Sequence, residues 1–285
     1  HFNILFDVTS FRSVFRFEIS DSMCAVLPFF HSFGYTCTFW LPMLTGFAVA
    51  YHANPLDGAT IAEIVRKHRL TVMLATPTFL QLYLRGCAPE DFGSLRLVLA
   101  GAEKLPERLA AAFEEHFGIR PLEGYGCTEC SPAVAVNTHD FRSAGFRQIG
   151  AKRGKIGHPL PGISVRIVDP EAFAAASGAG VPPVPPDVSP ASMPSGKSSN
   201  DRRDACPTMP VGQPGLLLVR GPNIMQGYLG RPEKTAEVMH DGWYVTGDIA
   251  AIDEDGFLQI TDRLSRFSKI GGEMVPHIKI EEKLH

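Results

Sequence analysis

The segment Glu123–Ser131, EGYGCTECS, brings together residue types that suit a nucleotide phosphate. Its two glycines let the backbone approach a ligand closely, and Tyr125 offers a ring face to a base. Thr128 supplies a hydroxyl that can reach a phosphate, and Glu129 supplies a hard carboxylate oxygen suited to Mg²⁺. An ordinary glycine-rich turn with a surface glutamate has the same composition, so these residues alone leave both interpretations open.

The number and spacing of the cysteines favour neither a zinc site nor a disulfide framework. Cys127 and Cys130 form a CxxC pair, but zinc needs about four ligands and the sequence has no second CxxC. Six cysteines in 285 residues are too sparse for a disulfide framework, and no leader pattern precedes them. We therefore expect a reducing compartment, the cytoplasm, and no metal held by these cysteines.

Composition favours a globular chain with no large electrostatic field. Hydrophobic residues make up 45% and charged residues 20%, close to the averages for soluble globular proteins. The 27 Lys and Arg against 30 Asp and Glu give a net charge of -3, so no global basic field exists to hold a polyanion. Nucleic acid is not an expected partner.

No Asp, Glu, Lys or Arg occurs between Asp21 and Asp57, a stretch longer than the roughly 20 apolar residues that span a membrane. Pro28, Gly34 and Pro42 interrupt it, however, and several hydroxyls lie inside it. A buried strand, helix and strand of an α/β core explains the stretch better. Any membrane contact is expected to be peripheral, at the inner membrane surface.

The first half of the chain alternates short apolar runs with helical periods. Strands are expected at 24–27, 47–51, 70–75 and 95–99, and helices at 58–68, 78–84 and 106–117. This alternation predicts an α/β fold whose mostly parallel sheet is flanked by helices. Ligands on such sheets bind in loops at the carboxyl ends of the strands, where Gly101, Ala102 and Glu103 follow one strand.

The second half predicts a smaller β subdomain, with strands at 165–168, 216–219, 244–245 and 257–260. Residues 182–214 carry nine of the 23 prolines, which predicts a flexible insert over 174–213. We expect three parts: an α/β portion over 1–160, the β subdomain over 161–262, and the start of a small C-terminal domain over 263–285.

Four motifs in order give the chain a family resemblance. GYGCTE, together with the motifs at 220–235, 241–263 and 267–275, resembles the adenylate-forming, AMP-binding superfamily of acyl-CoA synthetases. Within it, residues 27–46, 100–107 and 269–275 are most similar to the group of acyl-ACP synthetases and 2-acylglycerophosphoethanolamine acyltransferases. The resemblance implies the adenylating fold of that superfamily, truncated at both ends.

The matching motifs imply roles in nucleotide binding. Asp248 corresponds to the carboxylate that accepts hydrogen bonds from both ribose hydroxyls, which suits a group that only accepts, and Arg263 to a second ribose contact. Tyr125 corresponds to the ring that stacks on adenine, Thr128 to an α-phosphate contact, and Glu129 to the Mg²⁺ ligand. A strand-end turn aspartate is the alternative interpretation of Asp248.

The resemblance also implies catalytic and hinge positions. With Thr128 and Glu129, it places His31 near the reacting carboxylate and Lys269 in the loop that swings in for thioester formation. From the residues alone, His31 would be a satisfied core histidine. Ser265 falls at the hinge. The remaining residues assigned to the nucleotide site are Gly101, Ala102, Glu103, Gly126 and Ile260.

The implied function is ATP-dependent activation of a long-chain fatty acid. The carboxylate attacks the α-phosphate of ATP to give acyl-AMP and pyrophosphate, and a thiol of CoA or of acyl carrier protein phosphopantetheine then displaces AMP. The family's phosphate loop and its C-terminal Gly-Lys motif are absent, so we expect a fragment that is inactive by itself. A truncated nucleotide-binding module and a ligase for another carboxylic acid are the alternatives.

Overall fold

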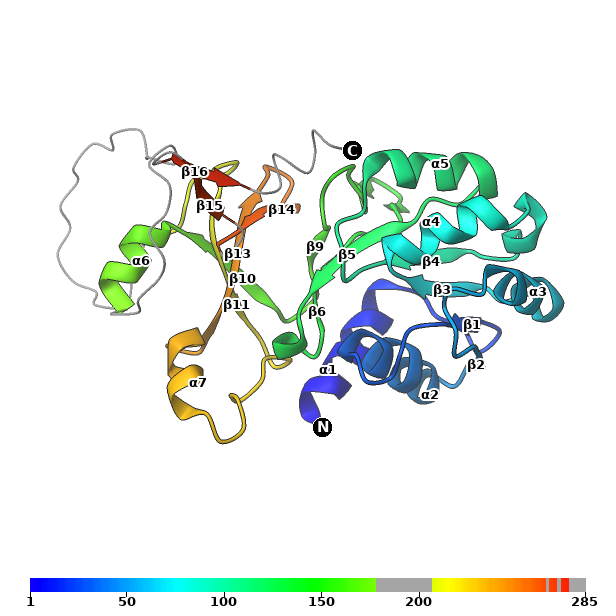
Figure 1. The fold of residues 1–285 in the computed structure, drawn as a ribbon, viewed down its shortest axis with the longest axis horizontal. Helices are drawn as coiled ribbons and strands as arrows, with labels where there is room; N and C mark the ends of the chain where they lie inside the picture. The colour runs from blue at the N-terminus through cyan, green and yellow to red at the C-terminus, as the bar shows by residue number, and fades with distance from the viewer. Residues whose placement is uncertain (178–206, 265–266, 271–272, 277–285) are drawn as a thin grey trace. The chain divides into compact units, whose positions relative to one another are not determined.

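The computed structural model describes residues 1–177, 207–264, 267–270 and 273–276, the last two ranges as backbone strands (Figure 1). The chain forms two compact units. Unit 1 comprises His1–Ile163 and Gly221–Met225, and unit 2 comprises Ser164–Arg220 and Gln226–His285. The part predicted to begin at residue 263 lies largely outside the described residues.

Unit 1 is built on a seven-stranded sheet in the order β2-β1-β3-β4-β5-β6-β9. Its first five strands are parallel, while β6 and β9 run antiparallel to their neighbours. The parallel strands are β1 (Ser22–Ala25), β2 (Ala48–Tyr51), β3 (Val72–Ala75), β4 (Leu97–Ala100) and β5 (Leu122–Gly126). The others are β6 (Ala133–Val136) and β9 (His158–Pro159). A hairpin of β7 (Phe141–Ser143) and β8 (Phe146–Gln148) precedes β9.

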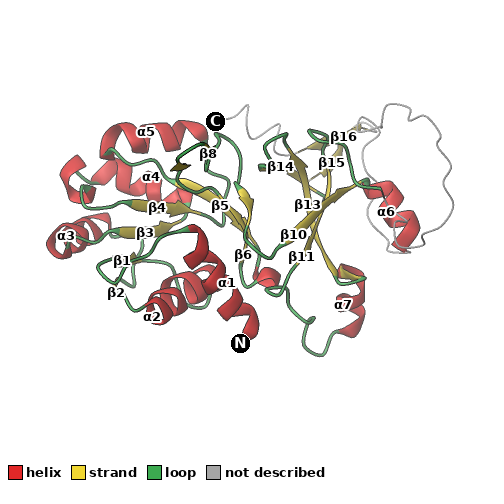
Figure 2. Cartoon of the chain, turned by 180° about the vertical axis from the view of Figure 1, so that it is seen from behind, coloured by secondary structure: helices red, strands yellow, loops and turns green. Residues whose placement is uncertain are grey.

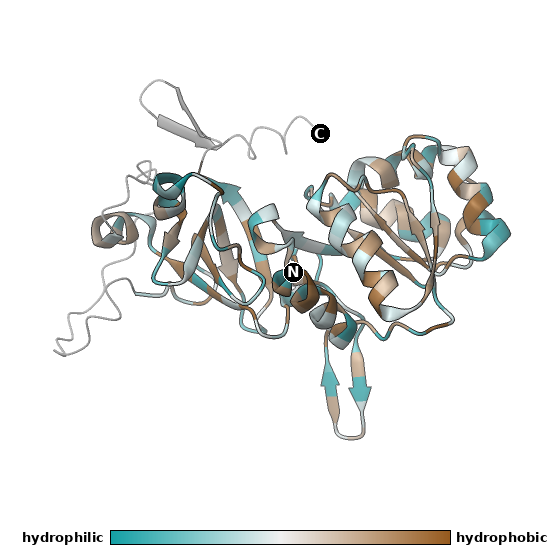
Figure 3. Ribbon diagram, turned by 90° about the horizontal axis from the view of Figure 1, so that it is seen from below, coloured by the Kyte–Doolittle hydropathy of each residue, from teal (hydrophilic) through white to brown (hydrophobic). Residues whose placement is uncertain are grey.

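Helices cover the parallel strands, which explains why every residue of β3 and β4 is buried. The helical segments are α1 (Phe2–Val14), η1 (Gly34–Trp40), α2 (Leu41–Thr45), α3 (Gly58–His68), α4 (Pro77–Gly86), η2 (Pro89–Phe92), α5 (Glu107–Phe117) and η3 (Thr128–Cys130). Figure 2 shows α3, α4 and α5 apart from α1 and α2, with strands between the two groups. Figure 3 shows apolar strands beneath helices that carry hydrophilic residues.

Local sequence signals account for the helix ends. Asp57 caps α3 by accepting a hydrogen bond from Thr60 N, and Thr76 caps α4 by accepting one from Phe79 N. Gly118 adopts a left-handed φ of 71° and ends α5. The predicted α/β fold is confirmed, and the uncharged stretch before Asp57 forms β1, η1 with α2, and β2. No helix within the described ranges is long and apolar enough to cross a membrane.

Unit 2 contains an antiparallel sheet in the order β10-β11-β13-β12, with β14 paired to β13. Its strands are β10 (Ser164–Val168), β11 (Gly215–Arg220), β12 (Met239–His240), β13 (Trp243–Ile252) and β14 (Leu258–Arg263), and its helices are α6 (Pro170–Ser177) and α7 (Pro232–Val238). A separate pair comprises β15 (Phe267–Ile270) and β16 (Glu273–Pro276). Val168, Phe173, Leu216, Leu218 and Ile249 form the core.

The prediction of a flexible insert over 174–213 is wrong at both of its edges. Helix α6 continues to Ser177 because the buried Phe173 anchors it to the core of unit 2. At the other edge, Thr208 bridges to Val168, and Met209 N donates a hydrogen bond to Ile167 O at 2.7 Å. Residues 178–206 lie outside the described ranges.

Candidate functional site

The predicted residues of the GYGCTE motif lie where β5 ends. Tyr125 and Gly126 are the last residues of β5, and Thr128 and Glu129 lie in the short helix η3 that follows. A Cβ on Gly126 would come within 1.9 Å of Pro132 O. Cys127 N also donates to Pro132 O, at 2.9 Å. A glycine is therefore required at position 126, because the loop folds back on itself there. This structural requirement exists in addition to any close approach of the backbone to a ligand.

The loop before η1 approaches the same place. Ser32 Oγ lies 3.3 Å from Thr128 Oγ1, within hydrogen-bonding distance. His31 is exposed, and its Nδ1 accepts a hydrogen bond from Phe33 N at 3.2 Å. The residue-based interpretation of His31 as a core histidine is wrong, because the ring sits on an exposed loop whose next residue contacts Thr128.

The segment Gly101–Glu103 follows β4, as predicted, and lies beside the end of β5. A Cβ on Gly101 would be 3.1 Å from the ring of Phe33 and 3.8 Å from Gly124 O. Ala102 has a left-handed φ of 69°, which is costly for a residue with a Cβ. Glu103 accepts hydrogen bonds from Thr78 N and Thr78 Oγ1, at 3.2 and 2.7 Å. Its carboxylate thus ties this loop to the start of α4.

One buried carboxyl in the same motif was not singled out from the sequence. Glu123, on β5, is 8% exposed and accepts a hydrogen bond from Leu105 N at 2.9 Å. Burial raises the pKa of Glu123 to about 7, against the opposing effect of that hydrogen bond. Glu123 therefore links β5 to the loop before α5.

A distant segment, Gly221–Met225, holds the η3 loop in place and is called the strap below. Asn223 is fully buried, and its Nδ2 donates to Cys130 O at 2.8 Å and to Ala133 O at 2.7 Å. Met225 N donates to Glu129 O at 2.7 Å. Sequence reasoning missed the strap because these contacts span 90 or more residues, although Asn223 lies within one of the recognised motifs.

The side chains around Glu129 suit a hard cation that also takes some of its ligands from a bound substrate. Glu129 is partly exposed and the neighbouring Thr128 is exposed, so both side chains can reach a ligand. In the described part of the chain no group of three or more His, Cys, Asp and Glu residues could hold a metal ion. Mg²⁺ commonly takes only one or two carboxylates together with substrate phosphates. Cys127 Sγ lies 3.2 Å from Cys130 Sγ, and both are free thiols.

The ribose-binding residues expected from the sequence lie in unit 2. Strand register pairs Asp248 of β13 with Arg263 at the end of β14, and Arg263 Nε lies 3.5 Å from Asp248 Oδ1. Asp248 N donates to Thr246 Oγ1 at 3.0 Å, after Gly247 with a φ of +75°. Ile260 pairs with Ala250 farther along the same two strands.

The last two predicted positions, Lys269 and Ser265, come after β14 in the sequence. Lys269 pairs with Met274 in the backbone of the β15–β16 hairpin. Ser265 lies outside the described residues. The structure thus gathers Tyr125, Gly126, Thr128, Glu129, His31 and the loop 101–103 within unit 1. Asp248, Ile260 and Arg263 form a second group within unit 2.

Comparison with known proteins gives a family match and several relatives. The family model described as AMP-binding enzyme matches residues 1–179. A long-chain-fatty-acid–CoA ligase of Yersinia pestis is 31% identical over 264 residues, which are 92% of this chain and 40% of that protein. A feruloyl-CoA synthase of an Amycolatopsis species is 31% identical over 90% of this chain and 44% of its own length.

Among solved structures, ATP-bound MatB from Rhodopseudomonas palustris superimposes with a TM-score of 0.77 at 26% identity. The match covers 99% of this chain and 48% of that one. The chain therefore spans less than half the length of each of these three proteins.

Proposed function

Because this chain belongs to the AMP-binding enzyme family, we propose that its two groups of site residues bind the AMP portion of ATP and of an acyl-adenylate. The observation that carries the proposal is the pairing of Asp248 with Arg263. Asp248 has a side chain only 13% exposed, and a neighbouring strand holds the cation beside it. An aspartate that only accepts hydrogen bonds, fixed in this way, suits the two hydroxyls of a ribose.

The proposed reaction is an AMP-forming ligation in two steps. The carboxylate of an acid attacks the α-phosphate of ATP, which releases pyrophosphate, and a thiol then displaces AMP from the acyl-adenylate. Thr128 orients the α-phosphate through its hydroxyl, and Tyr125 presents its ring to adenine. Mg²⁺ held by Glu129 would offset charge on the phosphates. The protein supplies position and charge rather than a nucleophile.

The substrate is proposed to be a fatty acid and the acceptor CoA. Support for these assignments comes from relatives named long-chain-fatty-acid–CoA ligase in Yersinia pestis and in Bacillus subtilis. Acyl carrier protein as an alternative acceptor is proposed from the motif resemblance of residues 27–46, 100–107 and 269–275. Any contact with a membrane is proposed to be peripheral. Lys269 and Ser265 are proposed for the thioester step and the hinge.

Calorimetric titration with AMP, and with a non-hydrolysable acyl-adenylate analogue, tests the nucleotide site. Asp248→Ala should weaken AMP binding by about 10-fold or more, since it removes a group that accepts charge-assisted hydrogen bonds. Asp255→Asn, a nearby exposed carboxylate in the turn between β13 and β14, is the matched control and should bind like the wild type. Equal affinity of Asp248→Ala and wild type would refute the ribose assignment.

A second assay separates chemistry from binding. Glu129→Gln keeps the shape of the side chain and removes its charge, so AMP should still bind. In the full-length enzyme of which we propose this chain is a part, fatty-acid-dependent exchange of pyrophosphate into ATP should fall by about 100-fold or more. If that full-length wild-type protein binds AMP tightly but shows no exchange with any acid tested, it acts as a nucleotide-binding module and the ligase proposal fails.

A further inference from the structure

One face of α1 carries polar side chains toward the interior of unit 1. Asn3, Asp7 and Ser10 are spaced i, i+4 and i+7, so they share a helix face. Asn3 Nδ2 donates to Pro222 O at 2.7 Å and to Ile224 O at 2.8 Å. Ser10 Oγ donates to Pro161 O at 3.2 Å. The middle residue, Asp7, accepts a hydrogen bond at Oδ2 from Ala133 N at 3.0 Å. Helix α1 thus holds the strap and the end of the η3 loop together.

Asp7 and Asn223 are both 0% exposed, and both bind the backbone of Ala133. Asp7 accepts a hydrogen bond from Ala133 N, and Asn223 donates one to Ala133 O. Asn223 uses Nδ2 to donate to Cys130 O and Ala133 O, which fixes the orientation of its amide. Within the described residues, Asp7 Oδ1 and Asn223 Oδ1 each lack a hydrogen-bond partner. Two buried acceptors without donors would be costly.

We propose that Asp7 is a protonated carboxylic acid that donates its hydrogen to Asn223 Oδ1 and so positions the η3 loop that carries Thr128 and Glu129. A single proton satisfies both oxygens. Asp7 is then an uncharged residue that links α1 to the strap and to β6 through hydrogen bonds. It is a positioning residue that acts through Asn223 and Ala133, and its role in holding the loop does not depend on which ligand the loop binds.

Within the described ranges, the titratable groups that interact with Asp7 are two thiols, Cys37 of η1 and Cys130 of η3. Neither is a positive charge that would hold Asp7 ionised. Burial raises the pKa of Cys37. A hydrogen bond with Cys127, followed by burial, raises that of Cys130, so both thiols are neutral. Burial raises the pKa of Asp7 to about 8, and the hydrogen bond from Ala133 N only partly opposes that effect.

This state predicts a sign for the pH dependence of stability. The folded protein holds the Asp7 proton up to a pH of about 8, whereas an ordinary aspartate loses it near 3.8. Between those values the unfolded chain binds fewer protons, so wild-type stability falls as the pH rises. Asp7→Asn is neutral at every pH and can accept from Ala133 N and donate to Asn223 Oδ1, so it lacks this dependence.

The test compares the unfolding midpoints of wild type, Asp7→Asn and Asp7→Ala from pH 4 to pH 8. The midpoint of Asp7→Asn should rise progressively above that of wild type as the pH increases. Asp7→Ala should melt below Asp7→Asn at every pH, because it leaves Ala133 N and Asn223 Oδ1 unpaired. Asp140→Asn, an exposed carboxyl, is the control for a general charge effect. A constant difference between Asp7→Asn and wild type would overturn the proposal.

Two further measurements test the proposal even if Asp7→Asn does not fold. Carbon-13 NMR of wild type labelled at aspartate carboxyls should show one carboxyl still protonated at pH 6, and the absence of such a signal would overturn the proposal. Alkylation of the buried Cys130 reports the position of the loop. The rate should rise at least 10-fold in Asp7→Ala and stay near the wild-type rate in Asp7→Asn. Equal rates in all three proteins would exclude a positioning role.

Discussion

The two groups of candidate site residues are placed by different kinds of structure. In unit 2, Asp248 and Arg263 come together because two adjacent strands pair in register, and only a short turn separates those strands. In unit 1, Thr128 and Glu129 depend on Ser32, Asn223 and α1, which are remote in the sequence. Strand register places one group locally, and long-range hydrogen bonds place the other.

The two groups should therefore respond differently to substitutions. A loop held by buried long-range hydrogen bonds loses several partners at once when its backbone shifts, and each unpaired group costs free energy. A pair held by strand register keeps its backbone when one side chain changes. The chain has two tryptophans, Trp40 in unit 1 and Trp243 in unit 2. Single-tryptophan variants therefore report the unfolding of each unit separately.

The largest effect is expected from a glycine in the unit 1 loop. In Gly126→Ala the added Cβ would lie 1.9 Å from Pro132 O, a backbone atom that cannot rotate away. We expect a loss of about 3 kcal/mol in the free energy of unfolding, measured by urea denaturation followed at Trp40.

Gly247→Ala, next to Asp248 in unit 2, is the matched variant. Its φ is +75°, but among the described residues no atom beyond the two chain neighbours lies within 4 Å of an added Cβ. It should cost only about 1–2 kcal/mol, the strain of the left-handed conformation, seen at Trp243. Equal losses of unfolding free energy for the two variants would contradict the distinction between a loop placed by long-range hydrogen bonds and a pair placed by strand register.

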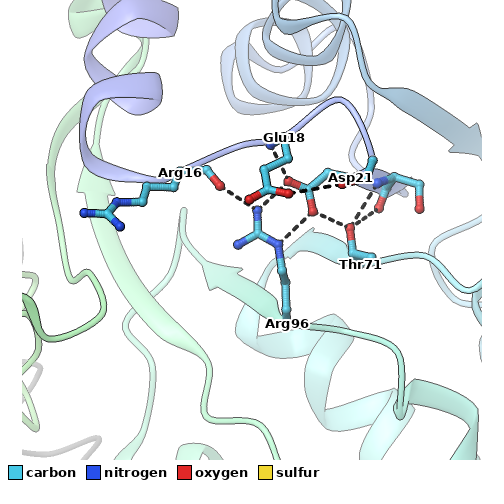
Figure 4. Close-up of polar contacts among 7 residues, drawn as sticks. Arg16, Glu18, Asp21, Thr71 and Arg96 are labelled. Carbon is cyan, nitrogen blue, oxygen red and sulfur yellow. Dashed lines mark hydrogen bonds and ion pairs between the residues drawn. The ribbon is translucent and has the colours of Figure 1, made fainter.

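A second, smaller effect tests long-range placement in unit 1, at the amino ends of the parallel strands β1, β3 and β4. Figure 4 shows Arg96 reaching Asp21, where Nε donates to Oδ1 at 2.7 Å and Nη2 contacts Oδ2. Thr71 Oγ1 also donates to Asp21 Oδ1, at 2.8 Å. Asp21 is buried while Arg96 is 40% exposed, so Arg96→Leu should cost about 2 kcal/mol at pH 7, less than a fully buried pair.

The pH dependence of this loss has a defined sign. Burial tends to raise the pKa of Asp21, but hydrogen bonds from Arg96, Glu18 N and Thr71 outweigh it and lower the pKa below 3.8. The stabilisation is present above that pH and is lost as the pH falls through the lowered value. The gap between wild type and Arg96→Leu should therefore narrow toward pH 3. Lys234→Ala, which breaks an exposed pair on α7, is the control and should change stability by less than about 0.5 kcal/mol.

The smallest effect on stability is expected at the proposed ribose contact. Arg263 is 57% exposed, so its interaction with Asp248 is screened by solvent. Asp248→Asn should change the free energy of unfolding by less than about 1 kcal/mol, followed at Trp243. The same variant should weaken AMP binding, which would show that the residue serves the ligand rather than the fold. A loss of stability as large as that of Gly126→Ala would instead make Asp248 a structural residue.

The sequence was sufficient for whatever depends on local pattern. The helical periods over 58–68 and 106–117 predicted α3 and α5 closely, because side chains a few residues apart determine such helices. The recognised motifs also named the side chains that the structure gathers at the end of β5. Asn223 and Asp7 could not be predicted, because their roles arise from partners 90 and 126 residues away. Composition misled at the edges of the insert, where one buried phenylalanine, Phe173, holds α6.

The strap also limits where the chain can be cut if unit 1 is to stay complete. Its residues belong to unit 1, yet they are encoded between β11 and α7 of unit 2. A chain that stopped at Ile163 would retain the whole seven-stranded sheet but lose Asn223 and Met225. The carbonyls of Glu129, Cys130 and Ala133 would then lose their donors. A gene segment that transfers unit 1 intact to another protein must therefore run through Met225 and carry β10 and β11 with it.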